Sequence, residues 1–202
     1  MRRKNKGKHK NKTLLRIILG LLVLAVLATA AFWGNELMLR SIYQKDHLTY
    51  VSDMAQEYGL DIYLVAAVVY VESEFHADAV SRKGAVGLMQ IMPETGEWIA
   101  GKLGFKHYTD EMLKDPQTNL RFGCWYLQYL LERYDSDVRL SLCAYNAGPG
   151  SVDQWLNNPA YTDNGKSLAK IPFDETRQYV DKVFDANEQY EKLYPSGGAV
   201  GD

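Results

Sequence analysis

The sequence predicts a mainly α-helical domain behind one N-terminal transmembrane helix. Residues 17–33 carry no charge, and residues 36–202 place apolar side chains at helical spacing, with no strand-like alternation of useful length. A hydrophobic content of 47% with 24% charged residues is that of a folded chain. A length of 202 residues fits one domain with accessory segments.

Charge divides the chain in two. Eight of its 23 basic residues lie in the first sixteen positions, before the first acidic residue, Glu36. The remainder holds 15 basic and 25 acidic residues, a net charge of −10. Such a body argues against nucleic acid as a partner, because phosphate binding requires clustered Lys and Arg.

The uncharged run from Ile17 to Trp33, extended by its apolar flank, can cross a bilayer as a helix. Basic residues stay on the cytoplasmic side of a membrane, so the domain is predicted outside. Ala28-Thr29-Ala30 resembles a signal-peptidase site, which makes secretion after cleavage the alternative. We favour a single-pass anchor, because the run is long for a signal core and Phe32 and Trp33 suit a membrane interface.

Beyond the anchor, six helices are predicted in order. An amphipathic helix over 49–58 stops at Gly59, and Asp61 is placed to cap the next one. That second helix, 62–75, is apolar on all sides, which predicts that it is buried at the centre of the domain. The remaining helices are expected over 94–103, 116–134, 138–147 and 174–194.

The helix over 138–147 should end at Gly148, with Pro149 blocking its continuation. Short hairpins could lie within 76–86 or 104–110. The predicted organisation is a basic cytoplasmic tail over 1–13, a transmembrane anchor over 14–34, a stalk over 35–47, a catalytic domain over 48–194 and a flexible tail over 195–202.

Metal and cofactor chemistry is not expected. The histidines beyond the anchor, His47, His76 and His107, lack the paired spacing of zinc ligands, and no Gly-rich phosphate loop occurs. Cys124 and Cys143 sit in apolar helical patterns, which fits two buried thiols as well as one disulfide.

Glu72 is the candidate general acid. It lies at the end of the central apolar helix, where burial and the negative end of the helix dipole both favour a protonated carboxyl. A carboxylic acid that is protonated near neutral pH is what general acid catalysis requires. Glu74, two residues further on, would face about 200° around the helix and is not expected to be a partner.

Four sequence blocks follow in order: Glu72-Ser73-Glu74-Phe75, Gly84-Ala85-Val86-Gly87-Leu88-Met89-Gln90-Ile91-Met92-Pro93, Ala144-Tyr145-Asn146-Ala147-Gly148-Pro149-Gly150 and Ile171-Pro172-Phe173-Asp174-Glu175-Thr176-Arg177-Gln178-Tyr179-Val180. With them, residues 48–193 resemble the catalytic domain of the soluble lytic transglycosylase family. The resemblance implies a goose-type-lysozyme-like fold. It also implies cleavage of peptidoglycan glycan strands between N-acetylmuramic acid and N-acetylglucosamine, leaving a 1,6-anhydro sugar. With the anchor, this places the protein in the bacterial cytoplasmic membrane, with the catalytic domain on the extracytoplasmic side.

The resemblance gives Glu72 the role of a single acid and base. The predicted substrate-binding residues are Ser81, Gly87, Met89, Gln90, Tyr145, Asn146, Glu175 and Tyr179. Physically, Gly84 and Gly87 would let the backbone approach a sugar, Met89 would offer a polarizable surface, and Gln90 would bind acetamido groups. Tyr145 would hold Glu72 or the sugar, and Glu175 would position the substrate.

Two departures from the family pattern stand out. His76-Ala77 replaces a common Asn-Pro, and Cys143 replaces a small residue, which suggests packing against Cys124 and leaves a disulfide open. Two other functions remain compatible with the sequence. One is a hydrolytic muramidase on the same fold, and the other is a non-catalytic protein of wall binding or assembly.

Overall fold

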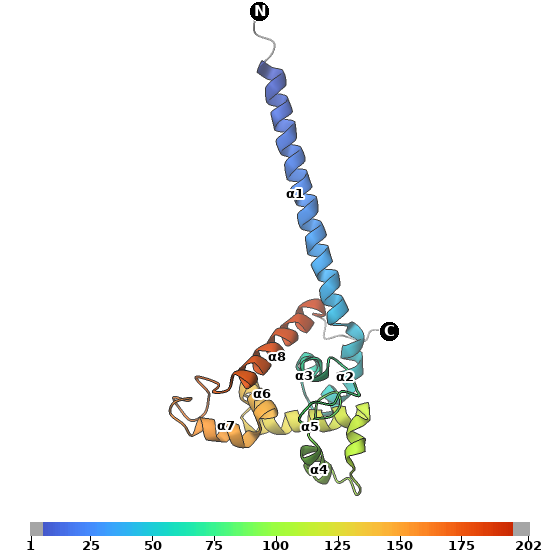
Figure 1. Cartoon of the computed structure of the whole chain (residues 1–202), viewed down its shortest axis with the longest axis vertical. Coiled ribbons are helices and arrows are strands. Elements are labelled where there is room, and N and C mark those ends of the chain that lie inside the picture. The colour runs from blue at the N-terminus through green and yellow to red at the C-terminus, as the bar shows by residue number, and fades with distance from the viewer. Residues whose placement is uncertain (1–5, 196–202) are drawn as a thin grey trace, which may run out of the picture. The chain divides into compact units, whose positions relative to one another are not determined.

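The structure is a computed structural model that describes residues 6–195 (Figure 1). The chain divides into two units that meet between Gln44 and Lys45. The first five residues of the expected basic tail, and residues 196–202 of the expected C-terminal tail, lie outside the described residues.

The first unit contains one helix, α1 (Lys6–Ile42), of 37 residues. Its segment Leu14–Ile42 has a mean hydropathy of 2.5 and is long and apolar enough to cross a membrane. At 1.5 Å per residue, these 29 residues extend about 43 Å, against about 30 Å for a hydrocarbon core. The expected stalk is therefore not a separate element, because its residues up to Ile42 continue the same helix.

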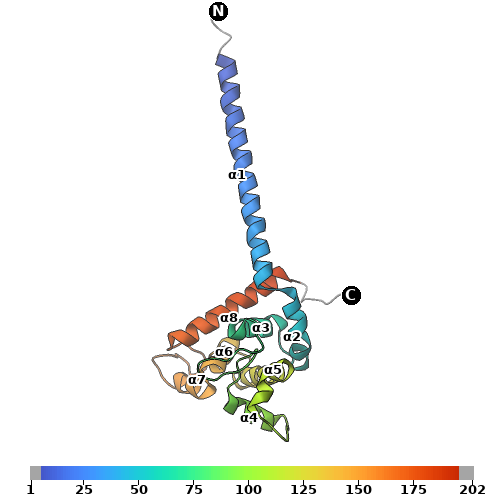
Figure 2. The ribbon, with the colours of Figure 1, turned by 45° about the vertical axis from the view of Figure 1, so that its right-hand side comes forward.

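The second unit begins at Lys45 and includes the segment 48–194, for which a catalytic domain is expected. Its helices are α2 (Lys45–Glu57), α3 (Ile62–Ser73), α4 (Pro93–Lys102), the 3-10 helix η1 (Asp110–Lys114), α5 (Pro116–Arg133), α6 (Val138–Ala147), α7 (Pro149–Leu156) and α8 (Asp174–Leu193). Figures 1 and 2 show α3 at the centre, between α2 and α8, and it packs on both. The mainly α prediction is confirmed.

The central helix α3 forms as its sequence predicts. The Asp61 carboxylate accepts a hydrogen bond from the Leu64 amide at 2.8 Å and caps the N-terminus. From Leu64 to Val69 every residue is buried. The helix ends where Glu74 adopts a left-handed conformation, with φ of 49°. The result is an apolar rod that carries Glu72 at its C-terminal end.

Helix α7 was not predicted. Gly148, at φ 83°, does end α6, but Pro149 then occupies the first turn of a new helix instead of closing the segment. The fixed φ of proline and its missing N–H suit that position, which explains the difference.

The two cysteines are separate buried thiols, so the disulfide left open by the sequence is not formed. Burial is the main cause that raises the pKa of Cys124, and also that of Cys143, to about 12. Both side chains therefore serve as apolar filling within α5 and α6.

The segment between α3 and α4 is a folded loop with little regular structure. Within residues 6–195, β pairing consists of two isolated antiparallel bridges, Val80 with Val86 and Val86 with Ile91. The hairpin considered for 76–86 is thus reduced to bridges, and the segment 104–110 forms turns that lead into η1. We call residues 79–92 the active-site loop.

Asn119 of α5 holds this loop in place. Its side chain is fully buried, its Oδ1 accepts a hydrogen bond from the Met89 amide, and its Nδ2 donates to the carbonyls of Val86 and Leu113, each at 2.8 Å. Gly87, at φ 81°, passes so close that a Cβ would collide with the Asn119 side chain. The loop and the amide side chain therefore form one packed unit.

Two further helices fix the same loop. The Ser73 hydroxyl of α3 donates to the Leu88 carbonyl at 2.8 Å, and the Tyr145 hydroxyl of α6 donates to the Met89 carbonyl at 2.9 Å. The Met89 side chain fills a notch that exists because residue 123 of α5 is glycine, where a Cβ would collide with its sulfur. Three helices thus set the position of one loop.

Replacing Asn119 by alanine should strongly destabilise the domain. The Met89 N–H and two carbonyls would lose buried partners, at about 1–3 kcal/mol each, so the loss should be at least about 2 kcal/mol in chemical denaturation. The matched control is Asn187→Ala, which removes one exposed bond to Glu191 and should cost less than about 0.5 kcal/mol. Equal losses in both variants would contradict a role for Asn119 in holding the loop.

Candidate active site

Glu72 lines a hollow at the end of α3. The hollow has a volume of about 490 Å³, and Ser81 and Gln90 of the active-site loop line it together with Glu72. The expected general acid and two expected substrate-binding residues are therefore neighbours, although Ser81 and Gln90 lie 9 and 18 positions beyond Glu72 in the sequence.

The Glu72 carboxyl is shifted toward its protonated form. Burial raises its pKa from 4.5 to about 7, and an interaction with the Tyr179 hydroxyl opposes this rise. Because the effect of burial is the larger one, Glu72 is protonated in a substantial fraction of the molecules at neutral pH. An acid in this state can protonate a leaving group and afterwards accept a proton.

Two tyrosines, Tyr145 and Tyr179, lie close to Glu72. Burial first, and the negative charge of Glu72 second, raise the pKa of both Tyr145 and Tyr179 well above 10. Among the described residues the Tyr179 hydroxyl makes no hydrogen bond of ordinary geometry, although it lies near enough to act on the Glu72 carboxyl. The Tyr145 hydroxyl is directed to the Met89 carbonyl, so its proton supports the loop.

Ser81 and Gln90 are held by the loop that carries them. The Ser81 hydroxyl accepts a hydrogen bond from the Ala85 amide at 3.0 Å, which leaves its proton available to a ligand. The Gln90 amide nitrogen donates to the carbonyls of Ala79 and Gly87, at 3.1 and 2.8 Å. Its amide oxygen is then the group that can accept a hydrogen bond from a substrate.

One of the predicted contacts is wrong, and a second predicted residue has a structural role of its own. The Met89 side chain is 0% exposed and packs against Gly123, so it cannot present a surface to a sugar. Gly87 is already required by the close approach of Asn119, and its contact with a sugar stays a prediction. Both residues belong to the support of the loop.

Glu175 lies apart from the hollow around Glu72. Its side chain is 74% exposed and pairs with Lys83 of the active-site loop at 3.3 Å, an exposed ion pair of small energy. Tyr179, four residues later on α8, is buried beside Glu72. Asn146 is exposed at the end of α6. The structure thus gathers Glu72, Ser81, Gln90, Tyr145 and Tyr179, while a role for Glu175 or Asn146 requires a substrate that extends beyond the hollow.

Sequence reasoning missed two residues that line the hollow, and it did not single out Met92. Glu74 and His76 line the hollow, because the left-handed turn at Glu74 redirects the chain from the helical path assumed for it. Met92 is 40% exposed, two residues after Gln90 and on the other side of the buried Ile91. The alternation of polar and apolar residues from Gln90 through Ile91 to Met92 was the signal that could have identified Met92 as the accessible methionine.

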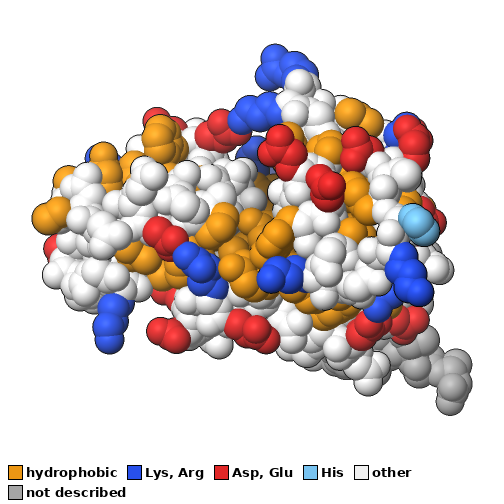
Figure 3. All heavy atoms as spheres, turned by 90° about the horizontal axis from the view of Figure 1, so that it is seen from below, with side chains coloured by type: hydrophobic (Ala, Val, Ile, Leu, Met, Phe, Trp, Pro, Cys, Tyr) orange, Lys and Arg blue, Asp and Glu red, His pale blue; other side chains and the backbone are white. Residues whose placement is uncertain are grey.

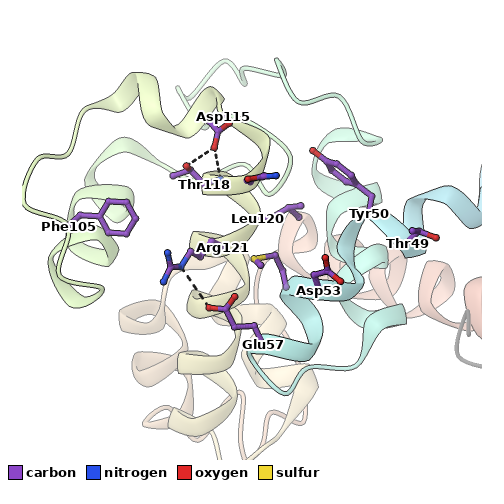
Figure 4. Close-up of a pocket in the computed structure, with 11 residues that line it drawn as sticks. Thr49, Tyr50, Asp53, Glu57, Phe105, Asp115, Thr118, Leu120 and Arg121 are labelled. Atoms are coloured by element: carbon purple, nitrogen blue, oxygen red, sulfur yellow. Dashed lines mark hydrogen bonds and ion pairs between the residues drawn. The ribbon is translucent and has the colours of Figure 1, made fainter. Parts of the chain in front are cut away.

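A larger cavity, of about 710 Å³, lies between α2 and α5 (Figure 4). None of the residues predicted for the site lines it. Several of its polar groups are engaged within the protein: Asp115 caps α5 through Thr118, and Arg121 bonds the Tyr58 hydroxyl and pairs with Glu57 at 4.0 Å. Across the described part of the chain, no cluster of three His, Cys, Asp or Glu could hold a metal ion.

Known proteins resemble this chain in sequence and in fold. Residues 49–167 match the family model of the transglycosylase SLT domain. The chain is 40% identical over 128 residues to the soluble lytic murein transglycosylase of Escherichia coli, covering 61% of this chain and 20% of that protein. It is 30% identical over 167 residues to the membrane-bound lytic murein transglycosylase C of Actinobacillus pleuropneumoniae, covering 72% and 46%.

Solved structures give the same result. One is an inactive glutamate-to-glutamine mutant of the lytic transglycosylase Slt from Pseudomonas aeruginosa, with a TM-score of 0.67 and 35% identity over 77% of this chain and 25% of that one. Another is a 70-kDa soluble lytic transglycosylase in complex with bulgecin A, with a TM-score of 0.69 and 29% identity over 81% and 27%.

The chain spans less than half the length of the curated relatives described above. The match to the family model nevertheless covers more than half of this chain, and it includes the end of α3, the active-site loop and α6. The chain therefore belongs to the transglycosylase SLT domain family.

Proposed function

We propose that this protein is a peptidoglycan lytic transglycosylase that cleaves the β-1,4 bond between N-acetylmuramic acid and N-acetylglucosamine. The observation that carries the proposal is the Glu72 carboxyl, whose pKa of about 7 places it between acid and base at the end of an open hollow. The SLT domain, and relatives named as lytic murein transglycosylases, support the same substrate.

In the proposed reaction Glu72 acts twice. Its proton passes to the glycosidic oxygen as the bond to C1 of muramic acid breaks, and the 2-acetamido group of that sugar assists at C1. The Glu72 carboxylate then takes the proton of the 6-hydroxyl as that oxygen bonds to C1. The product is a 1,6-anhydro sugar, and Glu72 regains its proton. An intramolecular nucleophile of this kind can have a very high effective concentration.

A relative supports a single essential glutamate, since the Pseudomonas aeruginosa enzyme is described as inactive when one glutamate is changed to glutamine.

One observation favours a second candidate function, a hydrolytic muramidase. Glu74 lines the same hollow as Glu72, and glycosidases that use water employ a second carboxylate.

We also propose that α1 anchors the enzyme in the bacterial cytoplasmic membrane as a single span, with the catalytic domain on the extracytoplasmic side. The length and hydropathy of Leu14–Ile42 support the span. The basic residues that precede it support an N-terminus in the cytoplasm. Relatives named as membrane-bound are consistent with this arrangement.

Glu72→Gln should lower the turnover of purified peptidoglycan by about two to four orders of magnitude, because it removes the proton while preserving the shape of the side chain. Binding of wall fragments should survive. Glu175→Gln should cost less, since it disturbs an exposed ion pair with Lys83. Turnover of both variants on one substrate is the measurement, and retention of activity by Glu72→Gln would show that the acid is misassigned.

Glu74→Gln and the mass of the products separate the two candidate functions. Transglycosylation predicts products without an added water and an active Glu74→Gln variant. Hydrolysis predicts products heavier by one water, and a large loss of turnover if Glu74 is the second carboxylate. The second result would replace the lytic transglycosylase proposal.

Activity and stability of the wild type should both fall as Glu72 loses its proton, and the stability of Glu72→Gln should lack this pH dependence. The wild-type rate should fall as pH rises through about 7, because the acid loses its proton. The fold favours protonated Glu72, so wild-type stability should fall between pH 4.5 and about 7, by no more than about 3 kcal/mol. Glu72→Gln lacks this loss and should melt higher than the wild type at pH 8 but not at pH 4. Parallel melting curves would contradict the burial of this carboxyl.

Protease added to intact protoplasts should remove a C-terminal epitope and leave an N-terminal epitope protected, because the basic tail is expected inside. The measurement is immunoblotting of both epitopes with and without detergent. A domain released into the medium and beginning near Ala31 would establish the secretion alternative instead.

A further inference from the structure

The turn that follows α3 is strained. Glu74 and Phe75 are consecutive residues in the left-handed region, with φ of 49° and 62°, and Gln90, which lines the hollow around Glu72, has a φ of 48°. Residues other than glycine persist in this region only where the surrounding structure fixes them, often at functional sites. The face in Figure 3, by comparison, mixes hydrophobic, acidic and basic side chains, as exposed surface usually does. The strained turn is therefore the more specific feature, and it begins two residues after Glu72.

The turn decides which side chains line the hollow around Glu72. A continuing α-helix would place Glu74 about 200° around the axis from Glu72. The left-handed turn instead brings both Glu74 and His76 to the hollow. The shape of the hollow thus depends on the contacts that hold the turn.

His76 holds the turn through its ring. Its Nδ1 lies 2.9 Å from the carbonyl oxygen of Ser73, and the same oxygen accepts a hydrogen bond from the His76 backbone N–H at 2.9 Å. Because a carbonyl oxygen can only accept, Nδ1 carries the proton of this bond. The Phe75 ring stacks on His47 of α2, with ring centroids 3.8 Å apart, and supports the turn independently. The ring of His76 therefore adds one bond to a turn that keeps other supports without it.

Ser73 connects this turn to the rest of the site. It follows Glu72 directly, is buried, and donates a hydrogen bond from its hydroxyl to the Leu88 carbonyl of the active-site loop at 2.8 Å. One residue thus joins the end of α3, the active-site loop and the His76 ring. A displacement of Ser73 would move Glu72 relative to Gln90.

We infer that His76 is a positioning residue for the proposed reaction: its ring holds the Ser73 carbonyl and thereby keeps Glu72 in place relative to the active-site loop. The inference rests on the proposed function, because it concerns the step assigned to Glu72. A misplacement of about 1 Å can lower an enzymatic rate by about a hundredfold. A ring that only stabilised the domain would change the melting temperature and leave kcat as it is.

Replacement of His76 by Asn, Gln and Ala separates its two ring nitrogens. Asn offers an amide N–H at the position of Nδ1, whereas Gln carries its amide one bond further out, near the position of Nε2. The test measures kcat and KM of the full chain in detergent on purified peptidoglycan, well below the Tm of each variant. His76→Ala and His76→Gln should lower kcat by about five- to fiftyfold with little change in KM. His76→Asn should recover most of the lost rate.

The matched control is His107→Ala, which removes an exposed histidine ring from the segment that leads into η1. Its kcat and KM should equal those of the wild type. This control shows what the loss of a histidine on the domain surface does by itself.

Three results would overturn the inference and leave the proposed function intact. Wild-type kcat in all three His76 variants, whatever their Tm, would make the ring merely structural. A His76→Gln variant more active than His76→Asn, with a raised KM in the latter, would make Nε2 a substrate contact. If His76→Ala does not fold, equal kcat values of His76→Asn and His76→Gln would contradict a role for the Nδ1 bond. A wild-type protein that does not cleave peptidoglycan would refute the proposed function, and the inference with it.

Discussion

The candidate active site depends on the burial of a loop that has no sheet to satisfy its backbone. Irregular backbone normally lies on the surface, because buried N–H and C=O groups need partners. Here the side chain of Asn119 supplies three bonds at once, and Ser73 and Tyr145 supply one each. The position of Gln90 relative to Glu72 follows from these bonds, which join α3, α5 and α6 to the loop.

The same helix that stabilises the domain also sets the chemistry of Glu72. Helix α3 is buried along most of its length, and that burial contributes the apolar core. At its end the burial extends to Glu72 and raises the pKa of the carboxyl. A charged Glu72 is therefore unfavourable for the fold, and the domain retains it at a cost in stability, as is common at functional sites.

The predictable part of the structure is the part that local sequence dictates. The cap at Asp61, the apolar run of α3 and the bounds of α6 follow from residues adjacent in the chain. Part of what could not be predicted depends on distant contacts: the burial of Met89 requires Gly123, which lies 34 positions away. Helix α7 was missed because a proline that ends one helix can equally begin another. Similarly, Glu74 reached the hollow through a left-handed turn that helical spacing does not anticipate.

The two buried thiols have a consequence for where the folded domain can persist. With a pKa of about 12, less than about one thiol in ten thousand is ionised at neutral pH, and only the thiolate reacts readily with oxidants. No disulfide is formed between them, so no redox bond has to be kept intact in the folded state. Once folded, the domain should therefore keep both thiols unchanged in an oxidising as well as in a reducing compartment.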